Sequence, residues 1–419
     1  MTMPDQLRAR RPPLAVIGVA LLLLIEMPQR VPAGPLSLSG VITLASAGLI
    51  IALAGIPILA RRHARDGQAR ARLGTRVEPL VTSPDSPAWV PWTLVGFALY
   101  AVARSVSGAT VDGYQNVAVL VTFVAGIAVT AAQSSRSSAD FMLKWARRAA
   151  VIASLAFLIT LQFGEPIYGE RSFALVALLY LAVLIPHRPE GFFARLAPYL
   201  VFLALVASLS RTAAAIGLAL MTFIALRAAR GRLVRGIAFT ALGAAAGLVL
   251  ITQYAPFRDR FLGGDNAVQY GGLTLNTSGR TILWEITIDD ARRNLWFGLG
   301  PGSSQDLITP LFRAISHPHN DYLRLLHDFG LIGLALFVAG YFTLMLRTFQ
   351  LARATNEPIH WSATMGLLAV ALAAVTDNPL VYPFVMYPLA ALVGLSLARA
   401  SGTGTSLDDV AKPAARVSP

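Results

Sequence analysis

Apolar stretches long enough to cross a lipid bilayer recur along almost the whole chain, and they constrain its fold more than any other feature. A transmembrane helix needs about 20 predominantly apolar residues. Hydrophobic residues make up 55% of the 419 positions and charged residues only 14%, which leaves too few charges to cover soluble domains. The sequence therefore predicts an all-α polytopic membrane protein with about twelve transmembrane helices and one large loop that contains short helices.

The expected spans divide the chain into four parts. Residues 1–253 hold nine helices, 254–322 form the large loop, 323–399 hold the last three helices, and 400–419 read as a disordered cytoplasmic tail. Pro379 and Pro383 predict an irregular start to the last span. The spans are expected near residues 14–27, 36–60, 88–103, 117–132, 149–163, 172–185, 196–208, 212–226, 237–253, 329–346, 361–375 and 380–397.

The distribution of basic residues predicts the orientation in the membrane. If the amino terminus is cytoplasmic, most of the 35 Lys and Arg residues fall on the cytoplasmic side, as the positive-inside rule requires. The short outer loops carry Arg30, Arg104, Arg171 and Arg211. The net charge of +13 is then explained by anchoring to anionic membrane lipids, since the charges form no single patch for nucleic acid.

The chain contains no cysteine, which excludes disulfides and thiolate chemistry and suits an oxidising compartment. The sequence Val31-Pro32-Ala33 resembles a signal-peptide cleavage site, but proline beside the cut is unfavourable. We therefore expect the first apolar segment to remain as a membrane span.

The large loop is the only long break in hydrophobicity. Residues 265–278 are rich in Gly, Asn and Thr and predict an irregular loop, whereas 280–294 show a helical period. A glycine-rich turn is expected at 294–304. Ser303 followed by Asp306 predicts a capping box that opens a short helix through residue 315, and Asn320 predicts the N-cap of the next helix.

Common catalytic motifs are missing from this loop. The chain has no phosphate-binding G-x-x-x-x-G-K-[ST], no G-x-S-x-G serine elbow and no D-x-D for a metal-bound nucleotide. His317 and His319 lack a clear third partner for zinc. The sequence predicts neither a metal nor another cofactor.

Several short motifs occur in a defined order. They are Ser208-Leu-Ser-Arg211-Thr, Ser278-Gly-Arg280 with Trp284 after it, Trp296-Phe-Gly-Leu-Gly300-Pro-Gly302, His319-Asn320-Asp-Tyr322-Leu and Gly330-Leu-Ile-Gly333. Each motif is short, but their order resembles the O-antigen ligase and polymerase superfamily across about residues 203–394. The lack of a second large outer loop favours the ligase branch.

This resemblance implies glycosyl transfer at the periplasmic face of the bacterial inner membrane. The donor would be a glycan on undecaprenyl diphosphate and the acceptor a sugar hydroxyl of lipid A–core. A hydroxyl needs a base, and a departing diphosphate needs cations. The matching positions imply His319 as general base, with Arg280 and Arg211 gripping the diphosphate. The expected position of His319 before a helix amino terminus would keep it neutral.

Other polar and aromatic residues are candidates for substrate binding. They are Arg104, Trp284, Asn320, Tyr322 and Asp377. Asp377 and the adjacent Asn378 could orient a hydroxyl or the base, although turn formation is the more ordinary explanation for both. Packing is the more ordinary explanation for Trp284. Three alternatives stay open: a glycan polymerase, a protein O-oligosaccharyltransferase, and a non-enzymatic flippase for lipid-linked oligosaccharides.

Overall fold

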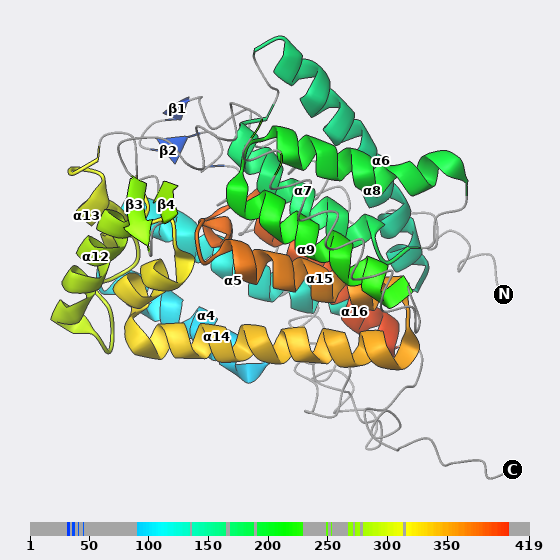
Figure 1. Ribbon diagram of the computed structural model, residues 1–419. Coiled ribbons are helices and arrows are strands. Elements are labelled where there is room, and N and C mark those ends of the chain that lie inside the picture. Colours follow the sequence, from blue (N-terminus) through cyan, green and yellow to red (C-terminus); the bar gives the residue numbers. More distant parts are fainter. Residues whose placement is uncertain are drawn as a thin grey trace, which may run out of the picture.

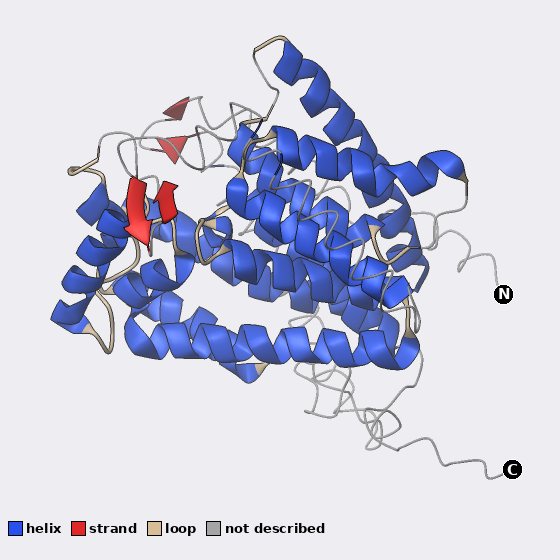
Figure 2. Cartoon of the chain, in the orientation of Figure 1, coloured by secondary structure: helices blue, strands red, loops and turns tan. Residues whose placement is uncertain are grey.

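The computed structural model is dominated by helices, with two small hairpins (Figures 1 and 2). It describes residues 90–134, 136–164, 168–187, 191–228, 267–270, 273–276, 280–312 and 316–401, together with a few isolated positions before residue 46 and near residue 250. The longer helices are α4 (Trp92–Val106), α5 (Val111–Gln133), α6 (Arg136–Gln162), α7 (Glu170–Leu184), α8 (Phe192–Ala207), α9 (Arg211–Ala228), α14 (Asp321–Thr355), α15 (Pro358–Ala373) and α16 (Pro383–Ser401). The shorter elements are α12 (Arg280–Ala291), η2 (Arg292–Asn294), α13 (Ser303–Ile308), η3 (Pro379–Val381), and the strand pairs β1 (Pro32–Ala33) with β2 (Leu36–Ser37) and β3 (Ala267–Tyr270) with β4 (Leu273–Asn276).

Each expected span that falls within the described ranges coincides with a helix. Within the described residues, three helices, α5, α14 and α16, are both long and apolar enough to cross a membrane, and α4, α8, α9 and α15 are shorter apolar helices. The spans expected at 14–27, 36–60 and 237–253 lie almost entirely outside the described residues, so the total of about twelve stays a prediction. The disordered tail expected after Ala400 also lies outside them, except that α16 reaches Ser401.

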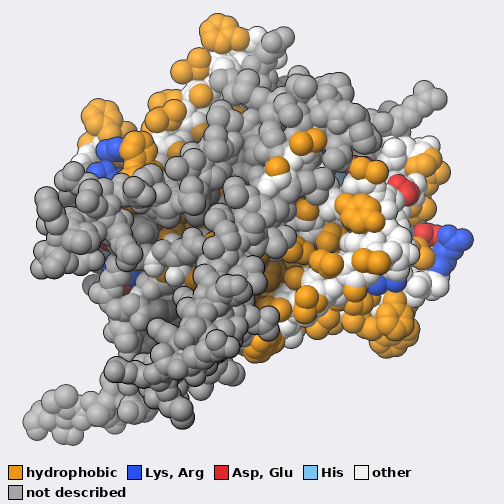
Figure 3. Space-filling view, turned by 180° about the vertical axis from the view of Figure 1, so that it is seen from behind, with side chains coloured by type: hydrophobic (Ala, Val, Ile, Leu, Met, Phe, Trp, Pro, Cys, Tyr) orange, Lys and Arg blue, Asp and Glu red, His pale blue; other side chains and the backbone are white. Residues whose placement is uncertain are grey.

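The helices pack through small residues and aromatic rings. At Gly394 of α16 an added Cβ would lie 2.5 Å from the Cβ of Thr130 on α5, so the absence of a side chain lets these two helices approach closely. Phe97 of α4 meets Phe329 and Phe337 of α14 edge to face, with ring centroids 5.6 and 5.2 Å apart. On the face seen in Figure 3, the described side chains are mostly hydrophobic and few are charged.

Three local expectations need correction. The segment 265–278, expected as an irregular loop, contains the antiparallel pair β3–β4, because extended backbones can satisfy each other's hydrogen bonds without an apolar pattern. Leu36 and Ser37 lie in a strand instead of at the start of a span. The helix α6 begins at Arg136, so the basic segment expected as a cytoplasmic loop is largely helical.

The helix α14 changes direction at Gly330. This residue has φ +68° and ψ −174°, which no helix accommodates and which glycine adopts without steric cost. The first part of α14 therefore follows its own course before the long apolar part begins. This break places the amino-terminal turns of α14 against α12, α13 and the turn that follows α15.

Candidate active site

His319 is held immediately before α14 in a strained backbone conformation. Its φ is +54°, in the left-handed region that residues with a side chain rarely adopt. The next residue, Asn320, caps the helix by accepting hydrogen bonds from the N–H groups of Tyr322 and Leu323, at 3.0 and 3.1 Å. On the other side, Nε1 of Trp284 donates to the carbonyl of Pro318 at 2.9 Å. These contacts confirm the N-cap and hold the backbone on both sides of His319.

Two side chains from distant elements meet the same nitrogen of His319. Nη2 of Arg171, from the first turn of α7, lies 2.8 Å from Nδ1, and Nδ2 of Asn378 lies 3.0 Å from it. A guanidinium has no acceptor, so Nδ1 must accept this hydrogen bond. The neutral imidazole therefore carries its hydrogen on Nε2, and the lone pair of Nδ1 is the basic position.

Asp377 orients the arginine that contacts His319. Nε of Arg171 lies 2.9 Å from both carboxylate oxygens, and Nη2 makes a further ion pair with Oδ1. Asp377 is buried, whereas the side chain of Arg171 is 39% exposed. The side chain of Arg171 is thus partly accessible, and a guanidinium is a suitable partner for an anionic ligand.

The surroundings of His319 favour its neutral form. Burial lowers the pKa of His319 most, the positive charge of Arg171 lowers it further, and Arg280 adds to this effect, while Asp377 opposes it; the pKa falls to about 4. The sequence predicted a neutral imidazole from the helix dipole. The structure gives burial and two arginines as the main causes.

Asp321 connects the His319 segment to the turn that carries Asp377 and Asn378. Its backbone N–H donates to the carbonyl of Ala374 at 2.8 Å, and its Oδ2 accepts from the N–H of Leu380 at 2.7 Å. Its Oδ1 accepts from Nε of the fully buried Arg324 at 2.7 Å. A buried carboxylate needs such partners, and here they set the distance between His319 and the residues opposite it.

The two arginines expected to grip a diphosphate begin helices near this cluster. Arg280 is the first residue of α12 and acts electrostatically on His319. Arg211 is the first residue of α9, and the adjacent Thr212 places its Oγ1 2.6 Å from Oγ1 of Thr376, next to Asp377. Both arginines stand at helix amino termini, which also favour anions.

The remaining candidates from the sequence make structural contacts. Nη2 of Arg104 donates to the carbonyl of Gly298 at 3.0 Å, so this arginine joins α4 to the glycine turn. The hydroxyl of Tyr322 donates to the carbonyl of Ala371 at 2.9 Å, and Trp284 is bonded to Pro318. Substrate contacts by Arg104, Trp284, Asn320 and Tyr322 stay predictions.

His317, the neighbour of His319, has a different environment. Burial and, after it, the positive charge of Arg324 lower its pKa to about 3. Its Nδ1 has no hydrogen-bond partner among the described residues. The charges of His319 and Arg171 also act on His317, but its Nδ1 takes no part in the hydrogen bonds that define the basic position on His319.

The glycine turn is fastened by a buried acid–histidine pair in α14. Asp328 accepts from the N–H groups of Gly302 and Ser304 at 3.1 and 3.0 Å, and Ser303 Oγ lies 3.0 Å from Nδ1 of His327. The predicted capping box is therefore wrong: Gly302 is the N-cap, and the hydroxyl of Ser303 bonds to α14. The short helix α13 ends at Ile308, well before residue 315.

Two residues of the cluster, Arg171 and Asp321, are not among the candidates from the sequence. The sequence marks Arg171 only as one of the arginines in the short outer loops, and Asp321 lies within the His319-Asn320-Asp motif. Asn378 was expected, with Asp377, to orient a hydroxyl or the base, and it contacts Nδ1 of His319. Their contacts join helices far apart in sequence, so no local pattern gives their roles.

The arrangement combines a basic nitrogen, oriented arginines and a buried carboxylate at adjoining helix ends. A neutral imidazole accepts a proton, and guanidinium groups stabilise phosphate oxygens. These are the groups that a transfer reaction with a phosphate-based leaving group requires.

Part of the chain resembles a known protein family. A family model described as O-antigen ligase matches residues 196–338. The matched region runs from α8 into α14 and includes Arg211, Arg280 and His319. No curated protein matches the chain.

Proposed function

Because residues 196–338 identify the chain as a member of the O-antigen ligase superfamily, we propose that it is an O-antigen ligase of the bacterial inner membrane. It transfers a glycan from undecaprenyl diphosphate to a sugar hydroxyl of lipid A–core at the periplasmic face. The observation that carries this proposal is the contact of Arg171 with Nδ1 of His319 at 2.8 Å, beside Arg280. It brings a base and phosphate-binding cations to one place.

The arginines bind the leaving group. Negative charge grows on the diphosphate as the anomeric carbon–oxygen bond breaks, and forked guanidinium donors stabilise that charge more strongly than water does. Arg280 and Arg211 bind the phosphates, and the partly exposed Arg171 completes the site. A diphosphate is already a good leaving group, so these cations take the place of a general acid.

His319 activates the acceptor. The lone pair on Nδ1 takes the proton of the sugar hydroxyl, the hydroxyl oxygen bonds to the anomeric carbon, and the bonding electrons to the donor leave with the diphosphate. Arg171 and Asn378 both contact Nδ1 in the structure. Binding of the diphosphate draws Arg171 toward the phosphates and makes Nδ1 available to the hydroxyl.

The ligase, polymerase and protein-glycosylating alternatives differ in the acceptor. Purified protein in liposomes should transfer glycan from the lipid-linked donor to lipid A–core, measured by a shift in gel mobility. Elongation of the donor glycan without lipid A–core would identify a polymerase, and labelling of a pilin-type protein would identify a protein oligosaccharyltransferase. Movement of the donor across the bilayer without any transfer product would identify a flippase.

A further inference from the structure

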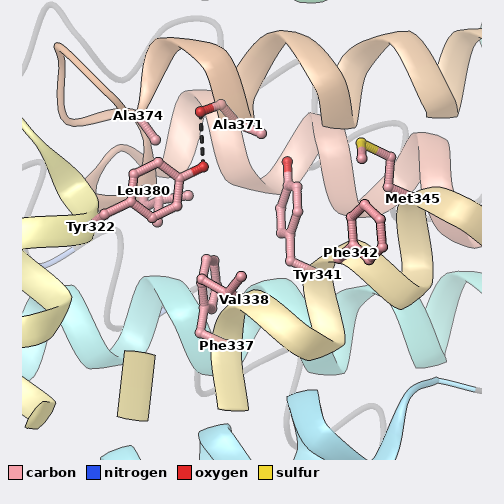
Figure 4. A pocket seen from close by; sticks show the side chains of 9 residues that line it. All are labelled: Tyr322, Phe337, Val338, Tyr341, Phe342, Met345, Ala371, Ala374 and Leu380. Carbon is pink, nitrogen blue, oxygen red and sulfur yellow. Dashed lines mark hydrogen bonds between the residues drawn. The ribbon is translucent and has the colours of Figure 1, made fainter. Parts of the chain in front are cut away.

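An apolar pocket lies between α14, α15 and η3, and its lining includes Tyr322, three residues after His319 (Figure 4). Its volume is about 100 Å³. Tyr322 closes one end, Phe342 and Met345 lie toward the other, and Ala371 and Leu380 form the opposite wall. The residues that line it thus come from both sides of the break at Gly330 and from the turn that follows α15.

The pocket offers almost no polar group to an occupant, although two tyrosines line it. The hydroxyl of Tyr322 donates to the carbonyl of Ala371 at 2.9 Å, and that of Tyr341 donates to the carbonyl of Leu367 at 2.8 Å. Both phenols therefore present their rings and not a free donor. Because the rest of the lining is aliphatic, aromatic or thioether, the pocket suits a hydrocarbon.

The same residues that build the active-site cluster also fix this pocket. Tyr322 follows His319 by three positions, and Leu380 follows Asn378 by two. Asp321 holds both sides, through its N–H to Ala374 and its carboxylate to the N–H of Leu380. A molecule with its charged group at the arginines would therefore have its adjoining carbon atoms at the pocket.

The pocket opens onto the apolar surface of α14. Val338 and Phe342, which line it, are 41% and 52% exposed. The helix α14 is one of those long and apolar enough to cross a membrane. A chain that leaves the pocket at this point would continue along a lipid-facing surface.

We propose that this pocket binds the isoprene units next to the diphosphate of the polyprenyl donor, a proposal that rests on the proposed function. An apolar cavity of about 150 Å³ takes up benzene, so this pocket has room for roughly one branched five-carbon unit. The adjoining arginines favour a chain that ends in a diphosphate over a phospholipid acyl chain. Seating this unit orients the anomeric carbon toward His319.

The first test uses binding alone. A sugar-free farnesyl diphosphate with a photoreactive group on its first isoprene unit should label the peptides around 337–345 and 371–380. Excess polyprenyl diphosphate should prevent the labelling, and excess phosphatidylglycerol should not. Labelling elsewhere, or equal competition by phosphatidylglycerol, would overturn the proposal.

The second test fills the pocket. Val338→Trp and, from the opposite wall, Ala371→Leu should each reduce labelling and raise the KM for the lipid-linked donor about tenfold, with little change in kcat, because several apolar carbons lose their burial. Leu346→Trp is the matched control, since Leu346 lies on the same helix with 42% exposure but outside the pocket. All three variants must reach wild-type levels in the membrane.

The two tests separate the pocket from the proposed function. If the labelling is as expected but no acceptor receives glycan, the ligase proposal fails and the binding site stands. If transfer occurs but Val338→Trp and Ala371→Leu behave like Leu346→Trp in both assays, the pocket proposal fails and the ligase proposal stands.

Discussion

Nη2 of Arg171 lies 2.8 Å from Nδ1 of His319, although 148 residues separate them in the chain. Asp377 contacts both Nε and Nη2 of the same guanidinium. The contact gives His319 a defined tautomer and places a cation beside the imidazole. Substitutions at His319 and at Arg171 can therefore test the contribution of each group separately.

Removal of His319 should abolish transfer. Loss of a general base costs about 10²–10⁴-fold in rate, so His319→Ala should show no detectable ligation in cells, while its membrane level and its affinity for the donor stay near wild type. His317→Ala is the control, because the hydrogen bonds from Arg171 and Asn378 are made to His319 and not to His317. Its loss of activity should be much smaller. Undiminished transfer by His319→Ala would refute the base, and equal damage from both would indicate disruption of the segment before α14.

The pH dependence of kcat/KM should reveal the effect of Arg171 on His319. A base works only in its neutral form, so activity falls as the pH drops through its pKa, which is about 4 in the wild type. Arg171→Gln removes the positive charge and leaves Asp377, so the pKa of His319 should rise and the acid limb should move toward pH 6.5. Arg171→Lys keeps the charge and should keep the limb low. If the acid side of the kcat/KM profile lay at the same pH in both variants, the charge of Arg171 would not control the pKa of His319.

The arginines at the starts of α12 and α9 should need their forked geometry. Arg280→Lys retains charge but not the two-pronged donor, and hydrogen bonds to charged groups contribute about 1.5–3 kcal/mol. We therefore expect a roughly 10- to 150-fold lower kcat/KM with normal membrane insertion, and at least as large a loss for Arg211→Ala. If Arg280→Lys and Arg211→Lys both transferred glycan at the wild-type rate, neither arginine would be needed as a forked donor to the diphosphate, and both would have structural roles only.

Transfer should persist when divalent metals are removed. The proposed chemistry uses arginines to stabilise the diphosphate, and the sequence has no D-x-D motif. Rates in liposomes should be equal with and without excess EDTA. Loss of activity in EDTA with rescue by Mg²⁺ or Mn²⁺ would show that a metal takes part.

The orientation of the chain can be tested with reporters. The basic-residue distribution predicts that alkaline phosphatase fused after residue 270 is active, because that point lies in the periplasm. The same reporter fused after Arg230 should be inactive. Activity in the opposite pattern would place the His319 cluster on the cytoplasmic side.

Local chemistry determined much of this protein from its sequence alone. Apolar length predicted helices such as α5 and α14, because a segment in lipid must satisfy its own backbone hydrogen bonds. Asn320 predicted the start of α14, since its side chain accepts from the next free N–H groups. Motif order indicated His319, Arg280 and Arg211, and the family match covers all three.

Tertiary structure decided which groups meet. Ser303 looked like a helix cap but bonds to His327, because a hydroxyl takes whichever partner the fold brings near. Arg171, Asp321 and Asn378 gain their roles from contacts between helices that are distant in the chain. Periodicity records which face of a helix is apolar, but not which helix will pack against it, and the tautomer and pKa of His319 depend on that packing.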